Sequence, residues 1–402
     1  MKAKKHLFLL ILLLLFSPLI CKISHKDLLV AVLMVKDEEA VMASTLEPLV
    51  QAGIESFFIL DTGSTDKTIE KTKYFFSEFP HCTCVIESEP FVDFATSRNK
   101  ALDLAEKSFP EAHFMLMLDA EWHLVNGNLL LDFCVKAIDE IEPVYLIRII
   151  SGIDFYTSRL IRCKTGARFE GVVHECIAAQ AKVLPEVYFE LHTTQYGAEK
   201  SRRRWQRDKQ LLLRAFKDNP YDSRSLFYLA QTCQCLGQTE EALQWYEARL
   251  SLPGWDEENF ITLYRIAQLY EELARASTDK AILAKAIYYY MEAYHYRPTR
   301  AEPLVRLALL YRAQDYFYPA FLFAQKAVSL PYPHNDSLFI EKELYDYDRY
   351  DVLGIVAWYC QEHELGEWAV LKALKAHPDY SHLHHNLLLY IEEKKSDKKI
   401  KC

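Results

Sequence analysis

Residues 114–121, FMLMLDAE, decide the fold of the first half of the chain, because an apolar run stops there at two acids. Phe114–Leu118 is continuously apolar, which is typical of a strand buried on both faces of an α/β sheet. Asp119 and Glu121 follow at once, at the carboxyl edge of that sheet, where open α/β folds bind ligands. Proteins usually hold Mg²⁺ or Mn²⁺ with one or two carboxylates together with substrate phosphates. The segment therefore predicts a divalent-metal site, with an acidic turn that binds nothing as the simpler alternative.

Two further buried strands are predicted upstream, and an acid follows each of them. Leu28–Val35 and Ser56–Leu60 are apolar runs, and Asp37 and Asp61 come just after them. Helical patterns lie between the runs, which predicts a parallel sheet with right-handed crossovers. Acids at three strand ends indicate a nucleotide pocket, in which such an Asp accepts hydrogen bonds from the base or ribose. The sequence has neither a G-x-G-x-x-G nor a P-loop pattern, so a dinucleotide domain and an NTPase are not supported.

Four motifs, in this order, resemble those of family 2 glycosyltransferases with the GT-A fold. They are VKDEE (Val35–Glu39), LDTGSTDKT (Leu60–Thr68), DFATSRNKA (Asp93–Ala101) and LDAE (Leu118–Glu121). The resemblance covers roughly residues 28–192 and implies an α/β GT-A-like domain that transfers sugar from a nucleotide-sugar donor with inversion. The sequence departs from the family at Glu121, where the usual Asp-x-Asp metal motif has Asp, and at Trp122, where many members carry another acid.

The resemblance also implies roles for individual residues. The implied donor-binding residues are Asp37 or its neighbour Glu39, Asp61, Asp66, Arg98 and Arg162. The implied ligands of Mn²⁺ or Mg²⁺ are Asp119 and Glu121, and His174 would ligate the metal or touch phosphate. Inverting transfer needs a base for the acceptor's proton, and the candidates are Glu175 first, with Asp154 and Glu170 behind it. The metal and an arginine would stabilise the leaving diphosphate, although Arg159 and Arg168 have the alternative of pairing with surface acids.

The chain after His192 reads as helical with short breaks. The stretch Glu199–Arg207, EKSRRRWQR, is expected to be a linker or helix start with a solvated basic face. Small and large apolar residues then recur at the spacings of four tetratricopeptide units, which resembles that family and implies a solenoid with a concave face. The acidic, Tyr-rich segment Glu341–Asp351 separates the last two units and is expected to be a solvated loop, with a partner surface as the alternative.

The N-terminus predicts a targeting segment. Lys2, Lys4 and Lys5 precede the apolar run Leu7–Leu15, and the apolar segment is shorter than the ~20 residues of a membrane-spanning helix. A secretory signal and an uncleaved membrane anchor both fit, so the protein is expected to be membrane-associated or in the secretory pathway. An uncleaved anchor is also compatible with a location on the cytosolic face of the membrane. The net charge of −9 argues against a general nucleic-acid surface.

Taken together, the sequence predicts four segments. They are a signal or anchor (1–22), a GT-A-like domain (27–197), a tetratricopeptide-like solenoid (198–390) and a charged tail (391–402). The expected function is transfer of a sugar from a nucleotide-sugar to a glycan, lipid or protein acceptor, with a protein partner on the helical repeats. The alternative is a non-catalytic scaffold with a degenerate GT-A domain.

Overall fold

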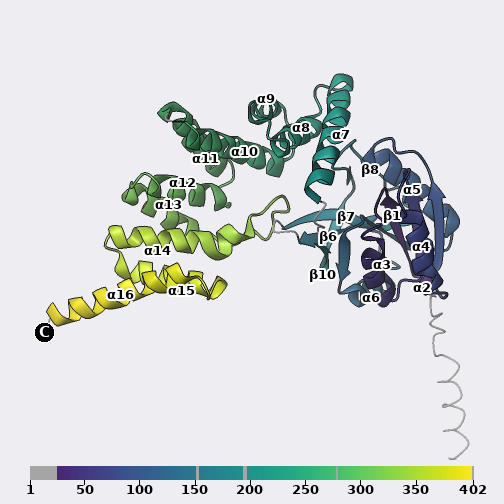
Figure 1. The fold of residues 1–402 in the computed structure, drawn as a ribbon, viewed down its shortest axis with the longest axis horizontal. Coiled ribbons are helices and arrows are strands. Elements are labelled where there is room, and N and C mark those ends of the chain that lie inside the picture. Colours follow the sequence, from purple (N-terminus) through teal and green to yellow (C-terminus); the bar gives the residue numbers. More distant parts are fainter. Residues whose placement is uncertain (1–24, 151–153, 193–196, 278, 401–402) are drawn as a thin grey trace, which may run out of the picture.

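The computed structural model of this 402-residue chain describes residues 25–150, 154–192, 197–277 and 279–400. The predicted signal or anchor, residues 1–22, lies outside them. None of the helices in these ranges has both the length and the apolar composition needed to cross a membrane. The described chain forms an α/β domain up to His192 and a helical solenoid from Gly197 onward (Figure 1).

The α/β domain alternates strands and helices as the sequence predicts in its first part. Its strands are β1 (Leu29–Val35), β2 (Ser56–Asp61), β3 (Thr83–Ser88), β4 (Phe114–Leu118), β5 (Trp122–Val125), β6 (Val144–Ile150), β7 (Asp154–Arg162), β8 (Phe169–Glu170), β9 (Cys176–Ile177) and β10 (Ala181–Leu191). Its helices are α2 (His25–Leu28), α3 (Met42–Gln51), α4 (Thr68–Ser77), α5 (Phe94–Ser108) and α6 (Gly127–Lys136).

The strands of the described part form one mixed sheet, in the order β3-β2-β1-β4-β7-β6-β10-β5, beside the small pair β8-β9. β3, β2, β1 and β4 are parallel, as predicted. β7 runs antiparallel to both β4 and β6, so the expectation of a parallel sheet is wrong for the second half. Only three residues separate β6 from β7, which is too few for the crossover that two parallel strands require.

Both faces of the sheet are covered, which explains why its central strands are apolar throughout. Along β1, Ala31 and Leu33 belong to one core cluster, which helices α3, α4 and α6 help to form. Val30 and Val32 face the other way and pack with residues of α5. Successive side chains of a strand point to opposite faces of the sheet. A continuous apolar run therefore contributes apolar side chains to the hydrophobic cores on both faces.

The solenoid consists of helices that pack in consecutive pairs. They are α7 (Gly197–Asp218), α8 (Ser223–Cys235), α9 (Thr239–Leu250), α10 (Asp256–Arg275), α11 (Lys280–Tyr296), α12 (Glu302–Arg312), α13 (Phe317–Ser329), α14 (Arg349–Tyr359), α15 (His363–Ala376) and α16 (Ser381–Ile400), with a π-helical turn, η1 (Leu344–Asp348), before α14. Pairs α8/α9, α10/α11, α12/α13 and α14/α15 correspond to the four predicted units. Ala230 and Ala242, on the two helices of the first pair, are completely buried, since small residues let paired helices approach closely.

One expectation about the solenoid needs correction. The acidic segment Glu341–Asp351 is not a solvated loop, because it contains η1 and the start of α14 and buries Leu344, Tyr345 and Tyr347. These apolar and aromatic side chains provide the burial that keeps the segment helical. The charged tail continues α16 as far as Ile400.

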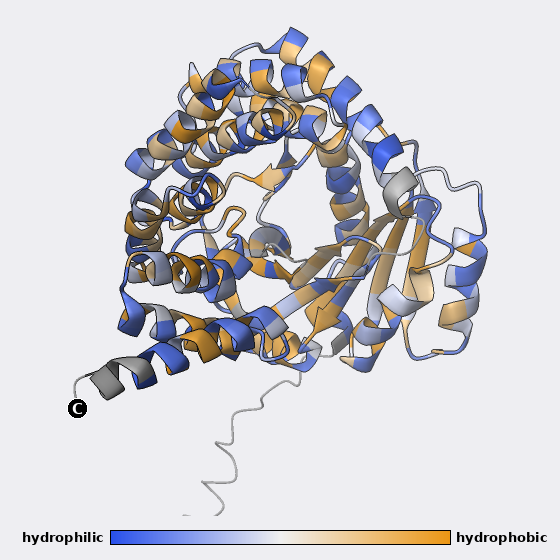
Figure 2. Ribbon diagram, turned by 60° about the vertical axis from the view of Figure 1, so that its left-hand side comes forward, coloured by the Kyte–Doolittle hydropathy of each residue, from blue (hydrophilic) through white to orange (hydrophobic). Residues whose placement is uncertain are grey.

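The solenoid contacts the α/β domain at its start and again through the segment before η1, and Figure 2 shows its helices in an arc that curves back toward the sheet. Near its start, the guanidinium of Arg207 lies over the ring of Phe94 at 5.5 Å. Farther along the chain, the ring of Phe339, just before η1, lies 6.4 Å from the ring of Phe155 on β7.

Candidate functional site at the carboxyl edge of the sheet

Three of the predicted acids lie at one edge of the sheet. Asp61 ends β2, opposite Val35 at the end of β1, and Asp37 follows two residues later. Asp119 follows Leu118, the last residue of β4, which also pairs with β1. Neighbouring parallel strands end at the same edge of a sheet, so the convergence that the sequence predicts is present.

Two buried arginines and two carboxylates form a cluster at this edge, here called the Arg98–Asp119–Arg159–Glu175 cluster. Arg98 Nη2 lies 2.6 Å from Asp119 Oδ1, and Arg98 Nε lies 2.5 Å from Glu175 Oε1. Arg159 reaches the same two carboxylates more loosely, at 3.5 Å from Asp119 Oδ2 and 4.0 Å from Glu175 Oε1. The Asp119 side chain is 29% exposed, whereas the other three are 4–7% exposed. Solvent or a ligand therefore reaches the cluster through Asp119.

The guanidinium groups of the cluster have more donors than the carboxylates satisfy. Arg98 Nη1 and both Nε and Nη1 of Arg159 are buried without a hydrogen-bond acceptor in the described structure. Burial and the charge of Arg98 lower the pKa of Arg159 to about 10. Burial alone would raise the pKa of Asp119, but Arg98 and Arg159 outweigh it and hold that pKa below its usual range. Unsatisfied buried donors on charged groups are costly, and a bound anion would satisfy them.

Asp37 joins the loop after β1 to the loop after β2, and Asp61 makes a hydrogen bond within the second of these loops. Asp37 Oδ1 accepts from the Thr65 amide at 2.7 Å, and Asp61 Oδ1 accepts from the Ser64 amide at 3.0 Å. Asp37 itself has φ 54°, a left-handed conformation that these bonds help to hold. The acids therefore pre-organise the two loops at the edge of the sheet.

Asp66 and Glu39 have the same kind of role. Asp66 accepts from the amides of Glu39 and Thr68, at 3.1 and 2.9 Å, and thereby fixes the start of α4. Burial is the largest single effect and raises the pKa of Asp66, yet the hydrogen bonds from Thr68 and Glu39 together outweigh it and lower that pKa. Glu39 Oε2 accepts from the Lys67 amide at 3.1 Å. Both carboxylates brace the loops around the edge.

Arg162 does not belong to this site, which corrects its prediction as a donor-binding residue. It pairs with Phe114 at the start of β4, the opposite end of that strand from Asp119. Its guanidinium donates to the carbonyls of Ala137 and Ile138, at 2.7 and 3.0 Å, just beyond the C-terminal end of α6. Because β7 runs antiparallel to β4, Arg159 is the arginine that this strand brings to Asp119.

His174 lies at the boundary with the solenoid and is not brought to Asp119 as a metal ligand. Its ring stacks on Tyr228 of α8 at 4.2 Å, and its carbonyl accepts from Arg224 at 3.0 Å. Although the residue keeps solvent-exposed surface, desolvation of the ring and the charges of Arg224 and Arg204 lower its pKa below the usual value. The ring is therefore neutral at pH 7 and serves the contact between domains.

Glu121 follows Asp119 by two residues and lies in a strained turn. Its φ is 73°, and its amide donates to Thr45 Oγ1 at 3.1 Å. Its carboxylate makes no hydrogen bond or ion pair within the described residues, so it is available to a ligand. Those residues contain no group of three or more His, Cys, Asp or Glu side chains placed around one metal position. A metal at Asp119 and Glu121 would thus depend on ligands from a bound substrate. Asp154 begins β7, and its side chain lies outside the described part.

Helix α7 adds two residues that sequence analysis missed. Arg204, Asp208 and Leu212 recur every four residues and so share one face of the helix. Leu212 is 1% exposed and packs in a cluster with Val173, which precedes Glu175 by two residues. Arg204 helps to lower the pKa of Asp119, which places its charge near the cluster. The signal in the sequence was the four-residue spacing that begins at Arg204, within the basic run, and continues through Asp208 to Leu212 beyond it.

Asp208 is a buried carboxylate without full hydrogen bonding. It is 4% exposed, and its Oδ1 has no hydrogen-bond partner in the described structure. Burial raises the pKa of Asp208 to about 6, against the opposing charges of Arg204 and Arg207, and Glu175 raises it further. Such an acid changes protonation near neutral pH, as a general base does.

Comparison with known proteins concerns the helical half. A family model described as tetratricopeptide repeat matches residues 211–244. Solved structures similar to this chain include a thermophilic TPR protein from Thermus thermophilus, with 20% identity over 48% of this chain and 93% of that chain and a TM-score of 0.32. A tetratricopeptide repeat protein from Parabacteroides merdae is similar at 19% identity, over 48% of this chain and 68% of that chain, with a TM-score of 0.33. YrrB, a TPR protein with an unusual peptide-binding site, is similar at 14% identity, over 49% of this chain and 88% of that chain, with a TM-score of 0.33. No curated protein matches. The helical half contains tetratricopeptide repeats, as predicted, and such repeats are consistent with binding of a protein partner.

Proposed function

We propose that the protein is a glycosyltransferase that moves a sugar from a nucleotide-sugar donor to an acceptor. One observation carries the proposal. The buried guanidiniums of Arg98 and Arg159 retain donors without acceptors, beside Asp119, at the edge where three parallel strands end. Ligands of open α/β sheets bind at this edge, and a nucleotide-sugar would bring both a nucleoside for the loops and a diphosphate anion for these donors. The motifs quoted above, which resemble family 2 glycosyltransferases, support the same class.

In this proposal, different residues at the edge of the sheet bind the nucleoside and stabilise the leaving diphosphate. The braced loops at Asp37 and Asp61 receive the nucleoside, and their existing hydrogen bonds limit the ordering cost of binding. Arg98 and Arg159 face the charge that develops on the leaving diphosphate, in a largely buried setting where such contacts are strong. The α/β edge therefore supplies donor binding and leaving-group stabilisation.

The chemistry of Asp119 and Glu121 fits a divalent ion that is shared with the donor. Within the residues that the structure describes, the Glu121 carboxylate makes no hydrogen bond or ion pair, and the one ion pair of Asp119 Oδ2 is the 3.5 Å contact with Arg159. These two residues would hold Mn²⁺ or Mg²⁺ together with donor phosphates. When bound, the ion would supply positive charge to the leaving diphosphate.

Two residues compete for the role of general base. Glu175 is the sequence candidate, but it would have to give up its 2.5 Å ion pair with Arg98 to accept a proton. Asp208 has a buried, unpaired oxygen and lies on the helix that covers this segment. We favour Asp208, since its protonation breaks no ion pair.

Asp208→Asn is expected to stabilise the protein at pH 7.5 and to impair transfer. The pKa of Asp208 is raised on folding, so the folded chain binds more protons than the unfolded chain between about pH 4 and 6. Its contribution to stability therefore falls as the pH rises through that window. Removing the charge should raise the free energy of unfolding by about 1–3 kcal/mol at pH 7.5 and by little at pH 4. Turnover should fall by about 10²–10⁴-fold.

Urea unfolding at the two pH values, with turnover measured alongside, checks this expectation. Asp218→Asn, at an exposed position on the same helix, is the matched control and should change neither quantity. A destabilised Asp208→Asn protein at pH 7.5, or one with normal turnover, would argue against Asp208 as the base.

The proposed function is tested by donor binding. Wild-type protein is screened by thermal shift against a panel of nucleotide-sugars with Mn²⁺, and slow hydrolysis is followed with and without chelator. A donor at 100 times its dissociation constant should stabilise the protein by about 2.7 kcal/mol. Arg159→Met should lose the shift, whereas Arg168→Met, which breaks a surface pair with Asp103, should keep it. If no donor shifts the wild type, the proposal fails.

A non-catalytic scaffold is the second candidate, and one observation favours it. Both carboxylates of the Arg98–Asp119–Arg159–Glu175 cluster are already paired with arginines, so the cluster is balanced in charge without any ligand. Together with tetratricopeptide repeats, this would suit a protein that only binds partners. Polypeptide binding without any response to nucleotide-sugars would select the scaffold.

A further inference from the structure

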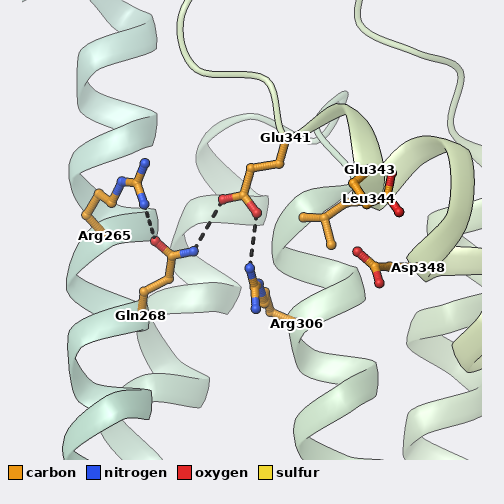
Figure 3. A pocket seen from close by; sticks show the side chains of 7 residues that line it. All are labelled: Arg265, Gln268, Arg306, Glu341, Glu343, Leu344 and Asp348. Carbon is orange, nitrogen blue, oxygen red and sulfur yellow. Dashed lines mark hydrogen bonds and ion pairs between the residues drawn. The ribbon is translucent and has the colours of Figure 1, made fainter. Parts of the chain in front are cut away.

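The second helices of the last three repeat pairs, α11, α13 and α15, form one face of the solenoid. The first helices α10 and α12 and the turn before α14 line a common polar cavity, which Figure 3 shows from close by. The first helices therefore lie side by side in one layer. Each second helix packs against the first helix of its own pair and against the helix that follows it. The second helices thus form the other layer, and their exposed residues are here called the second-helix face.

Large apolar side chains are exposed along the second-helix face. On α13, Tyr318 and Leu322 lie four residues apart and are 69% and 64% exposed. A spacing of three residues separates the exposed pairs on the other two helices, which are Tyr288 and Met291 on α11 and Trp368 and Leu371 on α15. Residues three or four apart share one side of a helix. Exposed apolar surface that is repeated on successive helices marks a site of contact with another molecule or with lipid.

The second-helix face is basic, although the chain carries a net charge of −9. Helix α13 contains no acid, and in the described structure Glu364 is the one acid exposed on α11 or α15. The lysines exposed on the three helices are Lys280, Lys285, Lys326 and Lys375. Within the described residues, none of these lysines forms an ion pair. Helix α9, the second helix of the first pair, exposes Glu240 and Glu247 instead, so the basic face begins at α11.

The kind of cation indicates which partner suits this face. None of α11, α13 and α15 contains an arginine, whereas protein interfaces are enriched in arginine and depleted in lysine. Tyrosine and tryptophan concentrate at membrane–water interfaces, and lysine lays its apolar stem along an apolar surface while its charge stays in water. Anionic lipid headgroups attract such lysines, each of which strengthens binding about fivefold. A lipid surface therefore complements both the charge and the apolar side chains.

We propose that the second-helix face docks on an anionic lipid surface. Tyr288, Tyr318 and Leu322 enter the headgroup region, where their apolar surface leaves water, and Lys326 and Lys375 pair with the anionic headgroups. The helices lie along the surface and do not cross it. The contact uses neither the residues of the sheet edge nor residues 1–22, so it is independent of the proposed sugar transfer and of the predicted signal or anchor.

The test maps which lysines of the full chain are covered by lipid. Purified protein is acetylated without lipid, with phosphatidylcholine vesicles, and with mixed phosphatidylserine–phosphatidylcholine vesicles, and modification of each lysine is quantified by mass spectrometry. With the phosphatidylserine vesicles, acetylation of Lys285, Lys326 and Lys375 should fall at least about fivefold, because the headgroups cover them. Lys73 on α4 and Lys107 on α5, which are exposed on the α/β domain, are internal controls and should change less than about twofold.

Two double variants measure the contribution of charge. Lys326→Gln combined with Lys375→Gln should raise the lipid concentration at which Lys285 is half protected about 25-fold, at about fivefold for each lysine. Lys73→Gln combined with Lys107→Gln makes the same change of charge on the α/β domain and should leave that concentration within about twofold of wild type. Absence of protection, equal protection by the two kinds of vesicle, equal protection of the control lysines, or equal half-protection concentrations in the two variants would overturn the proposal. Protection that appears without lipid and grows with protein concentration would also overturn it and would assign the face to a second copy of the chain.

Discussion

Asp119→Ala is expected to lower the rate of sugar transfer by at least about 10²–10³-fold, the usual effect of removing one electrostatic contact to developing charge. Asp119 is the most exposed member of the cluster, it forms an ion pair with Arg98, and it is the carboxylate nearer to Arg159. Without it, Mn²⁺-dependent donor binding should also be lost. Steady-state turnover and thermal shift with the best nucleotide-sugar from the panel measure the two effects.

The same substitution has a smaller cost in stability. Arg98 keeps its ion pair with Glu175, whereas Arg159 loses its nearer partner and retains only the 4.0 Å contact. A loss of about 1–3 kcal/mol is expected. Asp103→Ala, which removes an ion pair of Arg168 at an exposed position of α5, is the matched control and should keep full turnover. Wild-type turnover in folded Asp119→Ala protein would contradict the assignment of the site.

The largest expected effect on stability comes from the solenoid. Glu302→Ala should lower the free energy of unfolding of the solenoid by about 3–5 kcal/mol, because it leaves a buried arginine without its main partner. Arg300 and Glu302 are 1% and 0% exposed and lie 2.7 Å apart between Nη2 and Oε1. Tyr345 also donates to Glu302 Oε2 at 2.6 Å. Loss of the Glu302 carboxylate therefore leaves both Arg300 and Tyr345 without this partner. Urea unfolding followed by circular dichroism measures the change.

Two variants separate the buried pair from ordinary surface charge. Glu302→Gln retains an acceptor for Tyr345 and removes the charge, so its effect should be intermediate. Glu367→Ala breaks the ion pair with Lys394, whose side chain is 55% exposed, and should cost no more than about 1 kcal/mol. A Glu302→Ala protein as stable as the Glu367→Ala protein would mean that Asp336, at 3.3 Å from Arg300, compensates fully.

The sequence by itself determined the local structure of the sheet edge and the repeats. Phe114–Leu118 had to be a strand with both faces covered, because five successive apolar side chains point alternately into two cores. Asp61 and Asp119 then had to lie at strand ends, since parallel neighbours finish together. The spacing of small residues such as Ala230 and Ala242 likewise predicted closely packed helix pairs.

Only the tertiary structure decided which distant groups meet. Arg159, and not Arg162, reaches Asp119 because β7 is antiparallel to β4, and strand direction depends on the short β6–β7 connection and on pairing. Asp208 reaches the segment next to Glu175 only because α7 docks on the α/β domain through apolar contacts. Residue patterns report local burial and periodicity, whereas these meetings depend on packing between elements far apart in the chain.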